Sequence, residues 1–267
     1  MKNKTVVITG AANGLGKALA SEFSNRGYDL ALIDIDFTGL ENVQRQLKAT
    51  DNTVTIYQAD ISQEENVIRV QQEIIRDHHG VNILINNAAI SISREFENVG
   101  LEDFQNLFSI NFWGTIYCSR YFLSNLKLEN NSRLVNIISD FALMGFPGKT
   151  TYGSSKSAVM GFSNALKTEL AETTVKVCLV IPPPLDTNIV KNSIHIDETK
   201  KQKEAAFLQK HGMPVSKVAK RMADKIESGK FRIVVGTMMF WVDLFSRLFP
   251  TSIHKFIGKK KKKFGFV

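Results

Sequence analysis

The chain has few cysteines, few prolines and no long uninterrupted apolar run. Its 267 residues include only Cys118 and Cys178, which stand in apolar stretches sixty residues apart. A disulfide framework needs more cysteines than this, so we expect two reduced core thiols. The longest apolar stretch, Ile233–Phe245, is interrupted by Asp243 and is shorter than the roughly 20 residues that span a bilayer.

No apolar leader precedes the first predicted strand, because the chain opens MKNKTVVITG. We therefore expect no secretory signal and a cytoplasmic protein. Hydrophobic residues make up 43% of the sequence, which is near the globular average and allows a large core. The length suits one α/β domain.

The formal net charge of +8 is concentrated at one end of the chain. Residues 255–267 carry six lysines and no acid, which leaves +2 for residues 1–254. The sequence pI of about 9.4 therefore reflects a basic tail and not a nucleic-acid-binding face. We predict no nucleic-acid partner.

Apolar runs rich in valine and isoleucine alternate with helical patterns up to residue 181. Strands are predicted at 5–9, 29–34, 53–58, 81–85, 134–138 and 175–181, and a further short strand is predicted at 232–235. Helices are predicted at 14–26, 38–49, 63–78 and 152–172, with a helix-like stretch at 104–126. Continuous apolar strands suit a parallel sheet that is covered on both faces. The β-then-α order predicts the α/β class, with a doubly wound sheet in a single domain.

A glycine-rich turn, Thr9-Gly10-Ala11-Ala12-Asn13-Gly14-Leu15-Gly16, follows the first predicted strand and opens a helix. Glycines permit a tight turn and let the backbone approach a pyrophosphate, while the helix N-terminus supplies free N–H groups. In this context the turn predicts a dinucleotide site.

Asp34 ends the second predicted strand, eighteen residues after Gly16. A carboxylate there accepts hydrogen bonds from the adenosine ribose hydroxyls and repels a 2′-phosphate. No Lys or Arg stands at residues 11–13 or 35–36 to neutralise that phosphate. The sequence therefore favours NAD(H) over NADP(H), with Asp36 as the cap of the following helix.

Tyr152 and Lys156 open the helix predicted at 152–172. Positions four apart lie on one helical face, so the phenol and the ammonium are predicted to project together. A free phenol has a pKa of about 10, and a nearby ammonium lowers that pKa by stabilising the phenolate. We therefore predict that Tyr152 acts as a general acid and base.

Two further polar residues stand where this chemistry needs them. Ser139 follows the strand predicted at 134–138, at the edge where α/β sheets place ligands, and its hydroxyl is suited to hold a substrate oxygen. Asn111 lies in the helix-like stretch, where a buried amide needs partners. It is expected either to fix a local kink or to anchor a water.

With these residues in order, the chain resembles a short-chain dehydrogenase/reductase of the single-domain branch over roughly residues 4–187. The glycine turn matches the family's cofactor turn, and Asn86-Asn87-Ala88-Ala89 is similar to its Asn-Asn-Ala-Gly motif. The residues that match the family's catalytic tetrad are Asn111, Ser139, Tyr152 and Lys156.

The resemblance implies a Rossmann fold and an NAD(H)-dependent oxidoreductase that interconverts a secondary alcohol and a ketone. Lys156 would also hold the ribose, and no metal is expected. The cofactor contacts that it implies are Gly10, Asn13, Gly14, Leu15, Gly16, Asp34, Asp60, Ile61, Asn87, Ala88, Tyr152, Lys156, Pro182 and Thr187. Ala89 and Pro183 depart from the family pattern, since each stands where the family has glycine.

The expected division is a catalytic domain at residues 1–250, with a substrate lid at about 188–213, and a basic tail at 251–267. Four apolar residues between Ser139 and Tyr152 suggest a pocket for a hydrophobic alcohol or ketone. They are Phe141, Leu143, Met144 and Phe146. The lid is rich in charged residues, which fits a solvated helix as well as a charged substrate site.

The C-terminal end is aromatic and then basic. Apolar residues recur there at helical spacing, at Trp241, Leu244, Phe245, Leu248, Ile253, Phe256 and Ile257. This pattern fits packing on the same domain or on a sister subunit, with the lysines as a solvated tail. It also fits docking on an anionic membrane surface.

Other functions remain open beside the leading hypothesis. One is a catalytically idle NAD(H)-binding scaffold that is recruited to a membrane surface. A sugar-nucleotide epimerase is disfavoured, because the roughly 80 residues after Pro182 can hardly supply its larger substrate domain. The family resemblance also implies a homodimer or a homotetramer.

Overall fold

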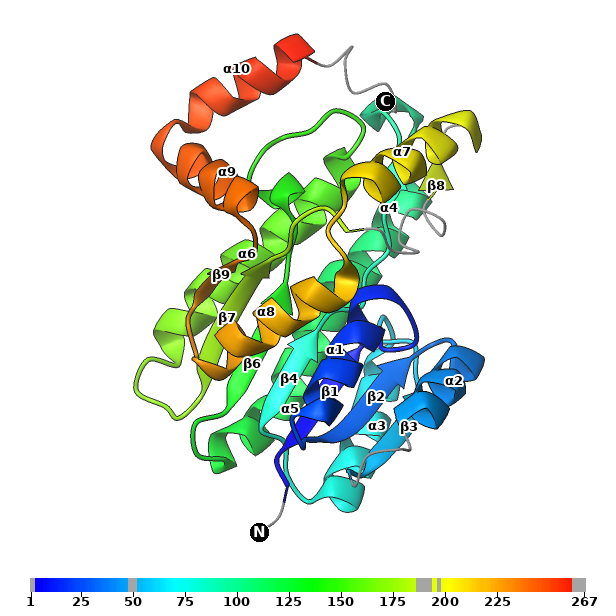
Figure 1. The fold of residues 1–267 in the computed structure, drawn as a ribbon, viewed down its shortest axis with the longest axis vertical. Helices are drawn as coiled ribbons and strands as arrows, with labels where there is room; N and C mark the ends of the chain where they lie inside the picture. The colour runs from blue at the N-terminus through cyan, green and yellow to red at the C-terminus, as the bar shows by residue number, and fades with distance from the viewer. Residues whose placement is uncertain (1–2, 48–51, 186–193, 196–197, 261–267) are drawn as a thin grey trace.

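A seven-stranded parallel sheet with helices on both faces organises the protein (Figure 1). The computed structural model describes residues 3–47, 52–185, 194–195 and 198–260. The strands of this sheet, in the spatial order β3-β2-β1-β4-β6-β7-β9, all run in one direction. This confirms the doubly wound, single-domain α/β fold that the sequence predicts.

The strands lie close to their predicted positions. Their bounds are β1 (Thr5–Thr9), β2 (Asp29–Asp34), β3 (Val54–Gln58), β4 (Ile83–Asn86), β6 (Arg133–Ile137), β7 (Lys176–Ile181) and β9 (Arg232–Val234). Alternate residues face opposite layers: Val6 and Ile8 join one core cluster, while Val7 joins the other. Burial on both faces is why these strands are continuously apolar.

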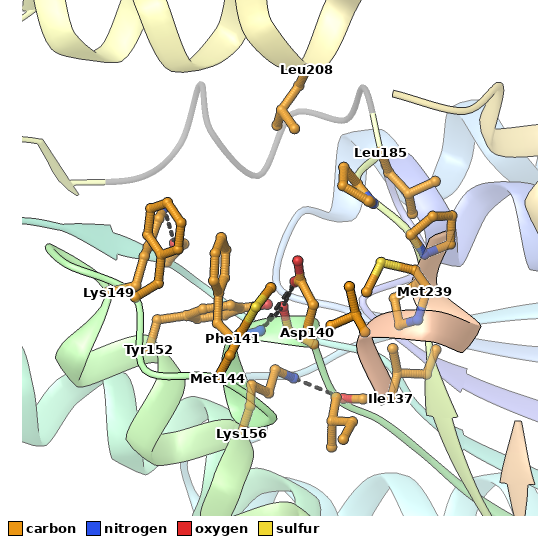
Figure 2. A pocket seen from close by; sticks show the side chains of 18 of the residues that line it. Ile137, Asp140, Phe141, Met144, Lys149, Tyr152, Lys156, Leu185, Leu208 and Met239 are labelled. Carbon is orange, nitrogen blue, oxygen red and sulfur yellow. Dashed lines mark hydrogen bonds between the residues drawn. The ribbon is translucent and has the colours of Figure 1, made fainter. Parts of the chain in front are cut away.

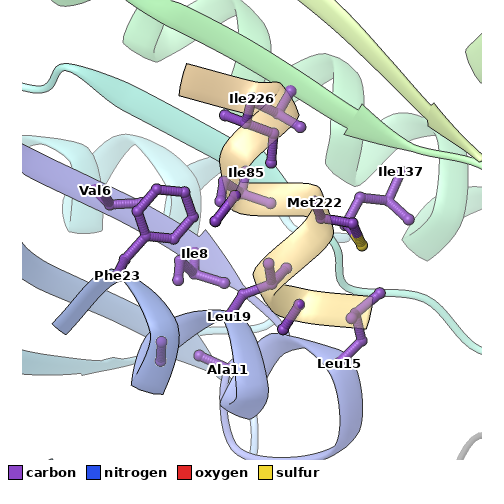
Figure 3. Close-up of a cluster of buried hydrophobic side chains, with 14 of the residues drawn as sticks. Val6, Ile8, Ala11, Leu15, Leu19, Phe23, Ile85, Ile137, Met222 and Ile226 are labelled. Atoms are coloured by element: carbon purple, nitrogen blue, oxygen red, sulfur yellow. The ribbon is translucent and has the colours of Figure 1, made fainter. Parts of the chain in front are cut away.

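Helices α1, α2 and α8 cover one face of the sheet, and α3, α5 and α6 cover the other. Their bounds are α1 (Gly14–Asn25), α2 (Phe37–Leu47), α3 (Glu64–His78), α4 (Leu101–Phe108), α5 (Gly114–Leu128), α6 (Thr150–Glu169), α7 (Glu198–His211), α8 (Val215–Glu227), α9 (Thr237–Leu248) and α10 (Pro250–Lys260). Figure 3 shows Leu15, Leu19 and Phe23 of α1 packed against Met222 and Ile226 of α8. This contact fixes α1 and, with it, the glycine turn.

The helix-like stretch at 104–126 is divided by a π-helix. Five residues, Ser109–Trp113, form the π-helix between α4 and α5, and Asn111 is fully buried within it. A π-helix commonly marks a functional position in a helix. The helix-like stretch is therefore irregular at Asn111, and the kink or anchored water expected there stays a prediction.

A small second sheet lies near the predicted lid and was not predicted from the sequence. Strand β5 (Ile92–Ser93) pairs in parallel with β8 (Ile194–His195). A second backbone link joins Pro184 O to the Met213 N–H at 3.1 Å. Both links place α7 over the carboxyl ends of the central strands (Figure 1).

Both cysteines are free and buried, as expected, in clusters on opposite faces of the sheet. None of the helices that the structure describes is both long and apolar enough to span a bilayer. Helix α10 places Ile253 and Ile257 against the body, so the residues expected as a tail include a packed helix. The division of the chain at residue 250 stays a prediction.

Candidate active site

The candidate site lies at the carboxyl edge of the sheet, where β1, β4, β6 and β7 end. The glycine turn follows β1, Asn87 follows β4, Ser139 lies two residues after β6, and Pro182 follows β7. Strand order reverses between β1 and β4, which is the position where open α/β sheets bind ligands.

The glycine turn comes too close to its neighbours for larger residues. A Cβ on Gly16 would lie 2.0 Å from Gly10 O, and one on Gly10 would lie 2.8 Å from the Cα of Ala88. Gly10 also has a φ of 66°, which favours glycine. The Asn87 amide nitrogen donates to Thr9 O at 2.9 Å and to Gly10 O at 3.1 Å, so the end of β4 holds the turn.

Three acidic residues near the turn have distinct contacts. Asp34 Oδ2 accepts from the Ala12 N–H at 2.9 Å, and Asp34 Oδ1 accepts from the Asp36 N–H at 3.0 Å. Asp36 Oδ1 accepts from the Gly39 N–H at 2.9 Å, which is the helix cap expected from the sequence. Asp60 caps a turn by accepting from the Ser62 N–H at 2.9 Å, with Ile61 buried beside it.

Asn111 acts as a fixed bridge between three segments. Its side chain accepts from the Ile90 N–H at 2.9 Å and donates to Ile90 O at 3.0 Å and to Ser155 Oγ at 3.1 Å. The amide is therefore fully used within the fold, and it ties the π-helix to α6 and to the segment after β4.

A carboxylate that the sequence reading did not single out lies beside Ser139. Ser139 Oγ donates to Asp140 Oδ1 at 2.8 Å, and the Phe141 N–H donates to the same oxygen at 3.1 Å. Burial raises the pKa of the Asp140 carboxyl, against the opposing effect of these hydrogen bonds. Its position directly after Ser139, before the apolar run that includes Phe141, was the available sequence signal.

Tyr152 and Lys156 lie one turn apart on α6, as predicted, and both are buried. Burial raises the pKa of Tyr152 well above its usual range, and the negative charge of Asp140 adds to this increase. Lys156 Nζ donates to Ile137 O at 3.0 Å, and burial lowers its pKa to about 8. The sequence-based prediction that the pKa of Tyr152 is lowered is therefore wrong for the protein chain by itself, because burial raises it.

A cavity of about 1130 Å³ connects the glycine turn to the catalytic candidates (Figure 2). Of the predicted site residues, those that line it are Gly10, Asn13, Gly14, Leu15, Asn87, Ala88, Ser139, Tyr152, Lys156 and Pro182. Those that lie outside its lining are Gly16, Asp34, Asp60, Ile61 and Asn111. Thr187 and much of the predicted lid lie outside the described residues.

The far wall of the cavity is apolar and comes largely from helices α7, α9 and α10. The apolar residues that line this part include Phe141, Met144, Phe146, Leu185, Phe207, Leu208, Met239, Trp241, Val242, Phe245, Ile253, Phe256 and Ile257. Phe141 and the tyrosine ring of Tyr152 pack edge to face, with centroids 6.2 Å apart. Proximity of α10 to the site could not be predicted from local periodicity.

A buried ion pair fastens α7 to the segment before α6. Lys149 Nζ lies 2.6 Å from Glu204 Oε1, with side-chain exposures of 4% and 7%. Ser93 Oγ donates to Glu204 Oε2 at 2.9 Å and accepts from Lys149. Breaking a buried pair by removing one partner is strongly destabilising, so this cluster holds α7 over the cavity.

The comparisons with known proteins agree with this architecture. A family model described as short chain dehydrogenase matches residues 4–197. SadH of Mycobacterium tuberculosis, whose name calls it an oxidoreductase, is 29% identical over 269 residues, covering 98% of this chain and 97% of that protein. The 3-ketodihydrosphingosine reductase of Bos taurus is 33% identical over 190 residues, covering 68% of this chain and 56% of that protein.

Among solved structures, a short chain dehydrogenase/reductase from Burkholderia phymatum in complex with NAD has a TM-score of 0.85 and 21% identity. The match covers 91% of this chain and 92% of that one. The fold, the site and the family match together define a dehydrogenase of the Rossmann type. This chain belongs to the short chain dehydrogenase family, which is a family of oxidoreductases.

Burial of Lys156 predicts a specific dependence of stability on pH. Its pKa is about 8 in the folded protein, against 10.5 for an ordinary lysine. Below pH 8 Lys156 is charged in both the folded and the unfolded protein, so the free-energy cost of burying its charge is fully present. Between these values the unfolded chain binds more protons, so the free energy of unfolding rises with pH.

We expect the substitution Lys156→Met to remove this contribution. We expect urea unfolding across pH 8–10 to show that the free energy of unfolding rises less with pH in the variant than in the wild type. The difference in slope should be up to about 1.4 kcal/mol per pH unit. The exposed Lys167→Met on the same helix is the control and should follow the wild type. Equal slopes for wild type and Lys156→Met would contradict the buried, titrating lysine.

Proposed function

We propose that the protein is an NAD(H)-dependent oxidoreductase that interconverts a secondary alcohol and a ketone on a hydrophobic substrate. The observation that carries this proposal is that Ser139, Tyr152 and Lys156 line the same cavity as the glycine turn. That arrangement brings a proton donor, a hydrogen-bonding hydroxyl and a dinucleotide cradle to one space. Two free, buried cysteines support a reducing, cytoplasmic location.

The residues present fit a dinucleotide. Gly10 and Gly16 have no room for a side chain, and α1 begins at Gly14. Backbone N–H groups there suit a pyrophosphate. Asn87 and Ala88 continue the cavity wall toward Lys156, whose ammonium would hold the ribose. When bound, NAD(H) would supply the hydride acceptor or donor for the reacting carbon.

The protein's own residues would then donate and accept the proton. In reduction, the Tyr152 hydroxyl donates its proton to the ketone oxygen, and in oxidation the phenolate takes the proton of the alcohol. Ser139 Oγ orients that oxygen. The raised pKa of Tyr152 keeps its proton in place at neutral pH, which is the form that reduction requires. Asn111 holds the π-helix against α6 and supports this geometry.

A hydrophobic substrate is supported by the wall of the cavity. Phe207 and Leu208 of α7, together with Met239 of α9 and Ile257 of α10, surround the space beyond Tyr152. The similar bovine protein is named as a reductase of a ketone, 3-ketodihydrosphingosine. An apolar wall of this kind binds hydrocarbon through removal of its surface from water.

Replacing the phenol tests the catalytic assignment. We expect Tyr152→Phe to lower kcat/KM for any ketone that the wild type reduces by at least about 100-fold, because the proton donor is lost. Binding of NADH, followed by fluorescence titration, should change little. Near-full activity in the variant would refute the role of Tyr152. A wild type that binds NADH but turns over nothing in a panel of ketones and alcohols would favour the idle scaffold.

Asp34 is the residue proposed to select NAD(H). Its carboxylate lies at the end of β2, and the neighbouring Asp36 adds negative charge near the site of a 2′-phosphate. We expect the wild type to bind NADH at least about tenfold more tightly than NADPH. Asp34→Ser should reduce that ratio, while Glu41→Gln, at an exposed position of α2, should leave it unchanged. Equal wild-type affinities would contradict the assignment.

A membrane surface is the proposed partner of the outer face of α9 and α10. We define the α9–α10 surface by its exposed apolar residues, Met238, Phe240, Trp241, Phe245, Leu248, Phe249 and Phe256. They are seven of the fourteen large apolar residues that the structure describes as exposed. This concentration is larger than isolated surface apolar residues explain.

The positive charge next to this surface favours an anionic bilayer as its binding partner. Arg247, Lys255 and Lys259 lie on the same two helices, and the sequence continues with four more lysines. The last acid of the chain, Asp243, is buried and pairs with Arg232. Lysines near an anionic bilayer contribute about 1 kcal/mol each. Trp241, Phe245 and Phe256 also line the cavity, so a lipid-borne substrate would enter from this side.

Vesicle pelleting tests this surface. We expect the full chain to sediment with vesicles that contain phosphatidylserine and much less with neutral vesicles. Phe240→Ser combined with Leu248→Ser should weaken binding, because both residues are exposed and neither lines the cavity. Leu128→Ser, at the exposed end of α5, is the matched control. Binding that does not distinguish the variants would overturn the proposal.

The homodimer or homotetramer implied by the family resemblance also stays a proposal. Analytical ultracentrifugation of the same variants separates it from membrane docking. If Phe240→Ser with Leu248→Ser dissociates an oligomer and leaves vesicle pelleting unchanged, then the α9–α10 surface is a contact between copies of the chain.

A further inference from the structure

Asp140 is a charged wall residue of the cavity that the mechanism above does not use. Its Oδ1 atom accepts from Ser139 Oγ and from the Phe141 N–H. The hydrogen bonds from other described residues to this carboxylate both reach Oδ1, and none reaches its Oδ2 atom. Figure 2 shows this carboxylate between Phe141 and Met239, facing the space below Leu208 of α7.

The local turn accounts for only one of the two carboxylate oxygens of Asp140. Ser139 and Asp140 begin a short 3-10 helix, and acceptance from the Phe141 N–H by Oδ1 satisfies that turn. An asparagine would do the same through its side-chain oxygen. A turn therefore accounts for an oxygen at Oδ1, and it gives no reason for a negative charge that faces a mostly apolar cavity.

Among the described residues, no cation forms an ion pair with Asp140. The charge of Lys149 favours the ionised carboxyl of Asp140 and so opposes the rise in its pKa, but the ammonium contacts Glu204, at 2.6 Å. Lys156 donates to Ile137 O on the other side of the site. A buried charge is costly unless it is paired. Burial is the main cause of the raised pKa of Tyr152, and the negative charges of Asp140 and Glu204 add to it.

We propose that Asp140 binds a protonated amine of the substrate, carried on the carbon next to the one that is oxidised or reduced. The substrate class is then a long-chain α-amino ketone or the corresponding α-amino alcohol. This proposal rests on the proposed function, because it names the substrate class of the same site.

The spacing of the two acceptors gives the position of the amine. Ser139 Oγ holds the substrate oxygen, and Asp140 Oδ1 lies 2.8 Å from Ser139 Oγ. Two groups this close together are able to contact substituents on adjacent carbons of one substrate. The oxygen of the reacting carbon therefore contacts Ser139, and a donor on the adjacent carbon contacts Asp140.

The remainder of the substrate is defined by the apolar wall. The apolar residues that line the same cavity as Asp140 include Met144, Leu208, Val242 and Ile257. A hydrocarbon chain fits this wall, while a second charged group would lose its hydration there without a partner. An ammonium at one end and an alkyl chain at the other satisfy both parts of the cavity.

A bound ammonium would also change the pKa of Tyr152, the proposed proton donor. Placed beside Asp140, it offsets the negative charge that adds to the rise in the pKa of Tyr152. It also lets Ser139 turn its hydroxyl from Asp140 toward the substrate oxygen. An amine-bearing ketone therefore gains both in binding and in positioning, whereas a plain ketone leaves Asp140 unpaired.

The decisive turnover experiment compares two ketones of equal chain length that differ only in the α-amino group. With NADH and the full chain, below the concentrations at which either forms micelles, the wild type should show at least about tenfold higher kcat/KM for the amino ketone. Asp140→Asn keeps the Oδ1 acceptor and removes the charge, so its ratio should fall to about one. Glu169→Gln, at the exposed end of α6, should keep the wild-type ratio.

A binding experiment separates this inference from the proposed function. Calorimetric titration of the NADH-bound chain with a long-chain α-amino alcohol and with the matched plain alcohol needs no turnover. A preference for the amine that Asp140→Asn abolishes supports the inference, even where no ketone is reduced and the proposed function fails. Turnover or binding without an amine preference, or an unchanged preference in Asp140→Asn, overturns the inference.

Discussion

The close approach of the glycine turn to the end of β4 is the constraint on which the site depends. Gly16 lies against Gly10 O, and the Asn87 amide donates to Thr9 O and Gly10 O. These contacts place the N-terminus of α1 beside the segment that leads to Ser139 and Tyr152. The packing of α1 on α8 holds the turn from the other side. A side chain at either glycine would separate the dinucleotide cradle from the catalytic candidates.

Burial is the second determinant of the site, because it changes the charges that the residues can carry. It raises the pKa of Tyr152 and Asp140 and lowers that of Lys156. The low dielectric around them strengthens every nearby charge, including one that a substrate brings. The ion pair of Lys149 and Glu204 is buried in the same region, where it closes α7 over the cavity. The proposed amine site at Asp140 and the ion pair that holds α7 therefore lie in one polar part of the cavity wall.

Much of the fold was predictable, since local patterns determine parallel strands and the helices between them. β1 and β2 begin and end at the predicted residues. The helix-like stretch at 104–126 showed where a break could fall but not its form, because a π-helix depends on the contacts of Asn111 with Ile90 and Ser155. The pairing of β5 with β8 joins residues about a hundred positions apart, and such short strands carry no periodic signal.

The sequence by itself determined the fold class, the glycine turn, and the order of Asn111, Ser139, Tyr152 and Lys156, because each follows from local spacing or from a motif. Only the tertiary structure decided what surrounds them. It brought α10 to the wall of the cavity, joined Lys149 to Glu204 across 55 residues, and left Asp140 Oδ2 facing the substrate space. These features depend on contacts between distant segments, and a one-dimensional pattern cannot show which buried charge has a partner.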